Sequence, residues 1–286
     1  MVEYTKEELE QIHKLTTEMA EYYVSFCQKH NLLCYLCGGG CIGTIRHKGY
    51  IPWDDDLDFF MPREDYSKFL ELWKNEDHPR YKMSNETRTY HDRNNYATIR
   101  DMETTQIKPY QADLDIVHGL VLDIIPIDGR APEGIKRKMQ VIYALIYSLY
   151  RTSIVPTKHG KLLQIGSWIL LNLVPKALHY PIWRYCEKKM TKYPLSESKY
   201  MTELCCGPAT LNKIYPSKAF EAAIFKPFED TEMPIPIGYH DYLTVAFGDY
   251  MQLPPKDKQK AHHEVVLLDL EKSYINYKGI AYLTEK

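Results

Sequence analysis

The sequence lacks a secretory signal, because Met1 to Glu8 has no basic region followed by an apolar run and no later segment resembles one. We therefore expect a cytoplasmic protein. We expect no membrane-crossing segment either, since the mostly apolar stretch Leu162 to Val174 is shorter than the ~20 residues that span a bilayer. Internal repeats and low-complexity tracts are absent. With 44% hydrophobic and 26% charged residues, the composition is that of an ordinary globular protein.

An excess of charge of either sign is also missing, because the formal net charge is −2. Such a chain has no global attraction to nucleic acid or to anionic lipid, so a polynucleotide partner is disfavoured. Any phosphate-bearing substrate must then be held by local groups or by metal ions.

A disulfide framework is not expected either, because the chain has seven cysteines, an odd number. Cys34, Cys37 and Cys41 invite a zinc site, since the first two have the spacing of a ligand pair. Cys205 and Cys206, however, are adjacent and would rarely complete a tetrahedral site. We favour buried, inert thiols over zinc ligands.

The first third of the chain alternates between helix and strand signals. Thr5 to Glu8 forms a capping-box pattern ahead of an amphipathic helix. Leu32 to Cys37 is a short apolar run that predicts a strand, and it stops at a glycine turn. A helix is predicted from Cys41 to about Lys48, and extended structure over Tyr50 to Phe60.

A further helix and a further strand are predicted after this segment. Pro62 and the apolar spacing after it predict a helix. Leu120 to Ile125 is apolar except for Asp123 and predicts a strand that ends at Pro126 and the turn-forming Asp128 to Gly129 pair. We expect the strands to share one sheet.

Three parts of the chain follow from these patterns. We expect residues 1–130 to form a catalytic core, 131–200 a helical insertion, and 201–286 a C-terminal part that completes the catalytic domain. Within the insertion, Leu162 to Val174 is apolar and contains Trp168. This segment either rests weakly on the inner membrane face, as a peripheral contact, or forms part of the core.

The densest chemical signal runs from Gly38 to Tyr66, where glycines precede a cluster of carboxylates. Asp56 and Asp58 are two apart, so on a strand both side chains would project from the same face towards one cation. Carboxylates crowded this closely repel one another unless a divalent ion neutralises them. Asp123 is the best third ligand, because a lone carboxylate in an apolar strand is costly to bury.

An acidic surface loop beside a glycine turn is the simpler explanation of an isolated DxD pattern. Here the glycines, the carboxylate pair and a third carboxylate in a separate apolar strand occur together, which favours a metal site. Glycines also let the backbone approach donor phosphates, and the N–H groups that open the next helix point at an anion.

The stretch from Gly38 to Tyr66 closely resembles the signature of LicD-type proteins, which include bacterial phosphocholine transferases and, more distantly, fukutin and fukutin-related protein. Three further segments resemble motifs of that family: TIRDMETT at 98–105, VLDIIPIDG at 121–129 and FGDYMQLPPKDKQKAHH at 247–263. The resemblance implies an α+β fold, with a nucleotidyltransferase-like mixed sheet flanked by helices. It also implies divalent ions held by aspartates that match Asp56, Asp58 and Asp123, with Asp54 as a further acidic position.

The activity that this resemblance implies is Mg²⁺-dependent (or Mn²⁺-dependent) transfer of phosphocholine from CDP-choline to a sugar hydroxyl, with release of CMP. The acceptor would be teichoic acid or another cell-surface glycan precursor, free or lipid-linked. Ribitol phosphate, another phosphoalditol or a nucleotide could be the group transferred instead. A non-catalytic scaffold with the same fold is the alternative from a different class.

Other residues are candidates for donor binding or catalysis. Arg100 could clamp the donor diphosphate or form a surface salt bridge. Arg46 begins a short basic run that could face phosphates or solvent, and at most one of two adjacent histidines would reach the site. Aromatic faces near the carboxylates could hold a choline cation. The expected donor-binding set is Gly38, Gly39, Gly40, Thr44, Arg46, Tyr50, Trp53, Tyr96, His262 and His263.

Overall fold

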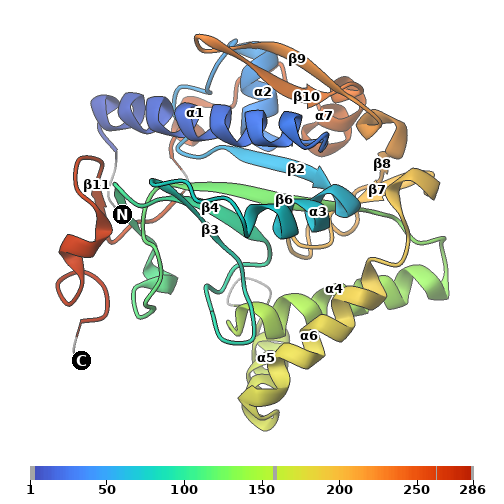
Figure 1. The fold of residues 1–286 in the computed structure, drawn as a ribbon. Helices are drawn as coiled ribbons and strands as arrows, with labels where there is room; N and C mark the ends of the chain where they lie inside the picture. The colour runs from blue at the N-terminus through green and yellow to red at the C-terminus, as the bar shows by residue number, and fades with distance from the viewer. Residues whose placement is uncertain (1–3, 157–159, 262, 285–286) are drawn as a thin grey trace.

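The computed structural model describes residues 4–156, 160–261 and 263–284, and its centre is a mixed β-sheet with helices on both faces (Figure 1). The strands lie side by side in the order β1, β2, β6, β4 and β3. β7 pairs with β6, and β8 pairs with β7, so these two strands extend the sheet. Only β2 and β6 run parallel among the described strand pairs of this sheet. The predicted α+β class is confirmed. The strands are β1 (Tyr35–Leu36), β2 (Asp58–Pro62), β3 (Tyr81–Ser84), β4 (Ala97–Asp101), β6 (Val121–Gly129), β7 (Tyr200–Thr202) and β8 (Tyr215–Pro216).

Helix α1 (Lys6–Lys29) covers one face of this sheet. Its predicted capping box is confirmed, because the Thr5 side chain accepts from the Glu8 N–H and the Glu8 carboxylate accepts from the Thr5 N–H. The Tyr23 ring of α1 packs edge-on against Phe59 of β2. Since side chains alternate along a strand, Asp58 and Phe60 must then point to the opposite face. Phe60 indeed meets Tyr242 there.

The glycine run was expected to be a turn, and that prediction is wrong. Helix α2 (Gly38–Arg46) begins at the first of the three glycines and ends two residues before Lys48. Glycine is a poor helix former, but packing overrides this preference here. A Cβ on Gly40 would lie 2.9 Å from a methyl group of Leu57.

The extended segment predicted from Tyr50 begins much later, because β2 starts only at Asp58. Its partner β1 pairs at just two positions, opposite Phe59 and Phe60, so nothing pairs with the residues before Asp58 on that side. Asp56 therefore lies in a loop and not on the strand. Helix α3 (Arg63–Trp73) follows Pro62 as predicted.

Strand β6 also differs from its prediction, since it continues through Pro126 to Gly129 instead of turning there. Pairing with β4 ends at Ile124, so the missing N–H of Pro126 interrupts no hydrogen bond to β4. Asp128 then pairs with β7 through Thr202.

Three helices lie below the sheet in Figure 1: α4 (Ile135–Thr152), α5 (Lys161–Leu173) and α6 (Lys176–Met190). α4 and α6 enclose a second hydrophobic core that includes Tyr147 and Trp183. The helices fall where helical structure was expected; their division from the catalytic core as an insertion stays a prediction. None of the helices formed by residues 4–156, 160–261 and 263–284 combines the length and apolar character needed to span a bilayer.

The C-terminal third of the chain packs against β1, α2 and β5. β9 (Ala223–Phe228) and β10 (Thr231–Pro236) form a hairpin, and α7 (Tyr239–Phe247) packs near α2. β11 (Leu267–Asp269) pairs with β5 (Thr105–Ile107). Short 3-10 turns are η1 (Pro109–Gln111), η2 (Leu195–Glu197), η3 (Ser217–Phe220), η4 (Lys256–Lys258) and η5 (Tyr274–Tyr277).

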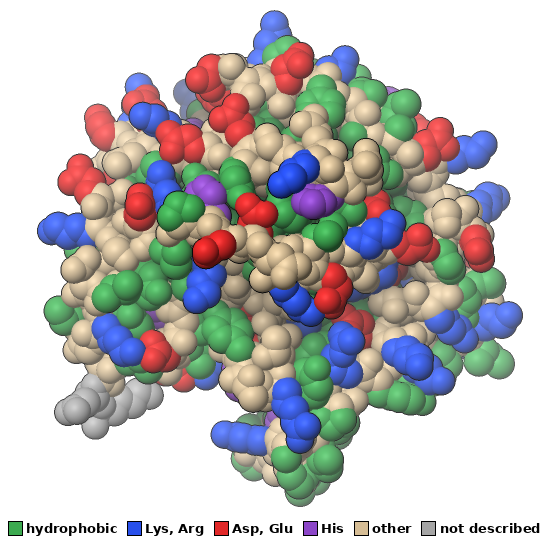
Figure 2. All heavy atoms as spheres, viewed as in Figure 1, with side chains coloured by type: hydrophobic (Ala, Val, Ile, Leu, Met, Phe, Trp, Pro, Cys, Tyr) green, Lys and Arg blue, Asp and Glu red, His purple; other side chains and the backbone are tan. Residues whose placement is uncertain are grey.

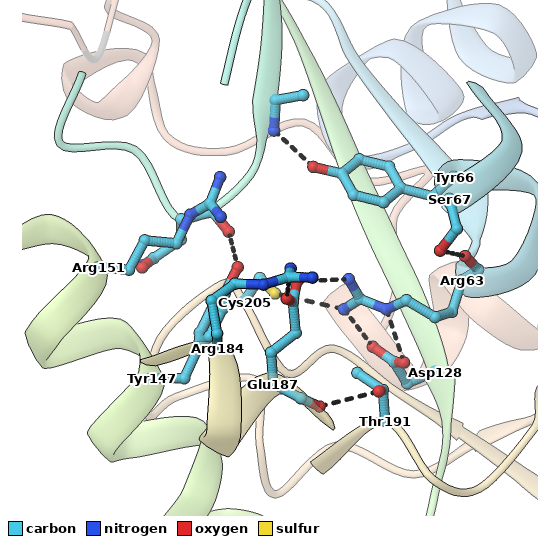
Figure 3. Close-up of polar contacts among 12 residues, drawn as sticks. Arg63, Tyr66, Ser67, Asp128, Tyr147, Arg151, Arg184, Glu187, Thr191 and Cys205 are labelled. Atoms are coloured by element: carbon cyan, nitrogen blue, oxygen red, sulfur yellow. Dashed lines mark hydrogen bonds and ion pairs between the residues drawn. The ribbon is translucent and has the colours of Figure 1, made fainter. Parts of the chain in front are cut away.

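A charged network joins α3, β6 and α6 (Figure 3). Arg63 donates through Nε and Nη2 to the two carboxylate oxygens of Asp128, at 2.9 and 2.7 Å. Its Nη1 lies 3.7 Å from Glu187 of α6, which also pairs with Arg184. The Asp128 side chain is fully buried, so Arg63 compensates a charge inside the protein.

The cysteines agree with inert thiols. All seven are free, and six of them are buried. A hydrogen bond with Cys27, and then burial, raises the pKa of Cys34 well above its usual range, and burial does the same for Cys37. The potential metal cluster found among the described residues contains no cysteine.

Candidate active site

A small cavity of about 10 Å³ lies where the parallel strands β2 and β6 begin. This volume is close to that of one water-sized sphere, so the space suits a single ion or water molecule. Polar side chains from four separate segments of the chain meet there. The lining residues are Asp55, Asp56, Asp58, Gln106, Lys108, Val121, Asp123 and His263.

The register of β2 and β6 brings the first two carboxylates together. Asp58 is the Cα partner of Asp123, and parallel neighbours in register project from the same face. That face is the one opposite α1. The Tyr96 hydroxyl lies 3.4 Å from Asp123 Oδ2, and burial together with Asp123 and Asp58 raises the pKa of Tyr96 well above its usual range. Tyr96 therefore belongs to the same site.

The loop before β2 carries the remaining carboxylates and is held by α1 and the β9–β10 hairpin. His13 of α1 bonds the Asp54 carbonyl oxygen through Nε2 at 2.7 Å. The Tyr50 N–H donates to Glu229 Oε1 at 2.8 Å, and its hydroxyl bonds the Thr16 hydroxyl at 2.7 Å. These contacts fix where the loop places its acidic side chains.

Tyr50 was expected to offer an open aromatic face to a donor, and the structure gives it another position. Its ring stacks on His13 with centroids 4.0 Å apart and meets Phe228 edge-on at 4.9 Å. The residue is buried. Tyr50 therefore supports the acidic loop, whereas Trp53 remains partly exposed.

His263 closes the cavity from the C-terminal part of the chain. Its Nδ1 lies 3.1 Å from Asp55 Oδ1, and its Nε2 lies 3.6 Å from Asp56 Oδ2. One ligand atom from each of these three residues lies within 4.8 Å of the others. The predicted trio was Asp56, Asp58 and Asp123; the structure instead groups Asp56 with Asp55 and His263, while Asp58 and Asp123 line the same cavity.

The electrostatics of the cluster fit a divalent cation. Burial, then Asp56 and Asp55, raises the pKa of Asp54 to about 8. Burial, then Asp56 and Asp123, raises the pKa of Asp58 well above its usual range. The folded protein therefore resists ionising these groups, and a cation would remove that cost. The carboxylate oxygens form a donor set suitable for Mg²⁺ or Mn²⁺.

Gly39 makes room for Asp54 at the start of α2. A Cβ at this glycine would overlap Asp54 Oδ2, so only glycine allows the carboxylate to lie against the first turn of the helix. Partial positive charge at a helix N-terminus stabilises a carboxylate placed there. From the sequence we expected the glycines to let donor phosphates approach the backbone. In the structure, Gly39 makes room for an acidic side chain.

We expect Gly39→Ala to lower turnover about a hundredfold with little loss of stability, because the added methyl group displaces Asp54 by steric overlap. A misplacement of about 1 Å in a catalytic group costs this much. Steady-state rates and thermal unfolding measure the two effects. The matched control is Gly166→Ala in α5, where a Cβ meets nothing within 4 Å. An unchanged rate in Gly39→Ala would show that the position of Asp54 does not matter.

Several predicted site residues lie elsewhere. Arg46 is at the far end of α2 and donates to the carbonyl oxygens of Tyr250 and Gln252. The Thr44 hydroxyl bonds the Gly40 carbonyl within the helix. The structure therefore does not bring Arg46 or Thr44 to the carboxylates, and His262 lies outside the described residues.

Arg100 is buried, with 1% of its surface exposed. Its guanidinium donates to the Val117 carbonyl at 2.9 Å and to Gln111 Oε1 at 3.2 Å. It is therefore neither a surface salt bridge nor open towards a donor. Arg100 shares a face of β4 with Thr98, which is opposite Asp123, but its guanidinium is held by Thr98, Gln111 and Val117 and not by the carboxylates.

Sequence patterns missed Asp55, Gln106 and Lys108. The Asp-Asp-Asp run contained a signal for Asp55, but its reach towards His263 depends on a contact across 208 residues. Lys108 follows β5, and its positive charge partly offsets the rise in the pKa of Asp56 and Asp58 that burial causes. No local pattern marks it, because only the fold of β5 brings it to the cavity.

A much larger cavity of about 930 Å³ lies at the other end of β2. Pro62 and Arg63 line it, together with Tyr193 to Tyr200. It contains none of the clustered aspartates. We therefore place the chemistry at the small acidic cavity and not at this larger one.

Comparison with known proteins points to the same region. Residues 31–119 match the family model described as LicD/FKTN/FKRP, nucleotidyltransferase domain. Over 263 residues the chain is 30% identical to the lipopolysaccharide cholinephosphotransferase LicD of Haemophilus influenzae. The match covers 85% of this chain and 91% of that relative. It thus extends well beyond the nucleotidyltransferase region.

Proposed function

The chain belongs to the LicD family, and from this premise we propose that it moves phosphocholine from CDP-choline onto a sugar hydroxyl and releases CMP. The acceptor we propose is teichoic acid or another cell-surface glycan precursor. The observation that carries the proposal is the acidic cavity, where four segments bring carboxylates, a lysine and a histidine to a space for one ion. The name of the similar protein supports the transferred group.

A bound Mg²⁺ or Mn²⁺ would supply neutralisation of the donor diphosphate charge. We propose that Asp56, Asp58 and Asp123 hold it, with Asp55 and His263 on the other side of the same cavity. Lys108 adds a positive charge for the CMP that leaves. Asp54, held against Gly39, is our proposed acceptor of the proton from the sugar hydroxyl.

We propose that Trp53 and Tyr96 recognise the choline group. A quaternary ammonium cannot donate a hydrogen bond, so aromatic faces and nearby carboxylates must hold it. Trp53 lies in the acidic loop and is partly exposed, and Tyr96 contacts Asp123. Ribitol phosphate would require hydrogen-bond partners for its hydroxyl groups instead.

Incubation with a panel of CDP-linked donors should show the fastest CMP release from CDP-choline, at least about tenfold above CDP-ribitol, and chelation of divalent ions should abolish it. The tenfold margin corresponds to one well-placed aromatic ring. Chromatography of the nucleotide products, with a glycan acceptor present, measures the release. Preference for CDP-ribitol would overturn the choline assignment but keep the enzyme class.

A variant separates choline recognition from nucleotide binding. Trp53→Ala should weaken CDP-choline about tenfold and leave CMP affinity unchanged. Equal weakening of both ligands would assign Trp53 to the nucleotide or to packing. A scaffold protein with this fold would release no CMP from any donor; the intact carboxylates argue against it.

A further inference from the structure

Helix α5 presents its apolar side chains outward. Leu162, Ile165, Ile169 and Leu173 follow helical spacing i, i+3, i+7 and i+11, so they form one stripe. They are 89%, 57%, 40% and 76% exposed, respectively. The buried residue of α5 is Ser167, which lies on the side away from the stripe. This pattern is the reverse of an ordinary surface helix, whose apolar stripe faces the core.

The stripe lies on a lobe at the edge of the molecule. Figure 1 places α5 at the lowest point of the view, beneath α4 and α6. Figure 2 shows hydrophobic side chains at the tip of this part, with Lys and Arg side chains beside them. Trp168, also on α5, is 58% exposed. Tryptophan favours the boundary between water and lipid, where one part of the ring is apolar and its N–H is wet.

The sequence segment that forms most of this lobe carries charge of one sign. From Gly134 to Cys186 the sequence contains no aspartate or glutamate, although the whole chain has 38 acidic and 36 basic residues. Lys161 begins α5 and Lys176 begins α6, so a lysine stands at each end of the stripe, and both are exposed. The net charge of the whole chain is near neutral, but this segment is basic.

An apolar groove of about 640 Å³ opens beside the stripe, between α4 and α5. Leu145 and Leu149 line it from α4, and Leu163 and Leu170 from α5. Its size lies in the range of cavities that bind small apolar ligands. The groove and the stripe share α5, so one surface can contact both the plane of a bilayer and a single chain that enters from it.

We propose that the α5 lobe docks in the plane of an anionic lipid bilayer, with the stripe among the acyl chains and Lys161 and Lys176 at the head groups. Apolar side chains flanked by basic ones, in a sequence segment without acidic residues, match the chemistry of such a surface. A second copy of this chain would present the same basic charges and repel them. This inference concerns a surface distinct from the acidic cavity and does not depend on the transferred group.

Flotation of the full chain with vesicles tests the proposal. We expect binding to phosphatidylcholine vesicles that contain phosphatidylglycerol, and much weaker binding to phosphatidylcholine alone. The stripe variant Leu162→Ser/Ile165→Ser/Leu173→Ser should lose binding by about a hundredfold or more, because three apolar side chains no longer enter the lipid. Lys161→Gln/Lys176→Gln should lose about 25-fold on anionic vesicles, near fivefold for each lysine.

The matched control is Ile275→Ser/Ile280→Ser, which removes two side chains of similar exposure, 64% and 72%, from another part of the surface. It should bind as the wild type does. Thermal unfolding checks that every variant is folded, and all substituted side chains are exposed, so no loss of fold is expected. Absence of wild-type binding, or equal binding by the stripe variant, would overturn the proposal. So would a wild-type dimer in sedimentation that the stripe variant converts to a monomer, since a second copy would then cover the stripe.

Discussion

Asp58→Asn is expected to reduce CMP release by about a hundredfold to a thousandfold while the fold stays intact. Asp58 stands at the start of β2 opposite Asp123, so the change removes one charge from the cavity without changing side-chain shape. The loss corresponds to a few kcal/mol of transition-state stabilisation by a metal site. Rates over a series of Mg²⁺ concentrations, with a CDP-linked donor, provide the measurement.

The thermal stability of Asp58→Asn is a second readout, and unlike the rate of CMP release it should not fall. Burial and the neighbouring aspartates raise the pKa of Asp58, so at neutral pH its ionisation works against the folded state. Without divalent ions, Asp58→Asn should therefore melt no lower than the wild type. Asp230→Asn, at an exposed turn position, is the control and should change neither quantity. If Asp58→Asn releases CMP at the wild-type rate at saturating Mg²⁺, Asp58 is not part of the metal site.

Arg63→Met is expected to lower the free energy of unfolding by about 3–5 kcal/mol, the cost of leaving a buried charge without its partner. Asp128 is that charge, since its side chain is fully buried and both its oxygens accept from Arg63. The change should also loosen the contact of α6 with the sheet, because Arg63 meets Glu187 (Figure 3). Denaturant titration followed by circular dichroism measures the loss.

Two comparisons isolate the buried pair. Lys74→Gln breaks an exposed ion pair with Glu71 on the same helix, where the side chains are 65% and 73% exposed, and should cost less than about 0.5 kcal/mol. Arg63→Met/Asp128→Leu removes both charges and should recover most of the stability. Equal stability of Arg63→Met and Lys74→Gln would show that Asp128 finds another partner.

Short-range patterns predicted the helices better than the strands. The capping box at Thr5 and the proline before α3 act within a few residues, and both elements appear where expected. The starts of α2 and β2 and the end of β6 were misplaced, because packing of Gly40 and the extent of strand pairing decided them. Local preferences are weak, and tertiary contacts override them.

The sequence by itself determined which residues carry the charge: a run of aspartates after a glycine-rich segment, and one aspartate inside an apolar strand. Carboxylates cost too much in such places without a partner, so their presence indicates chemistry. Only the tertiary structure decided which of them meet. The register of β2 and β6 sets Asp58 beside Asp123, and the pairing of β11 with β5 returns the chain so that His263 reaches Asp55. Contacts across 208 residues depend on how whole elements pack, and no local pattern encodes that packing.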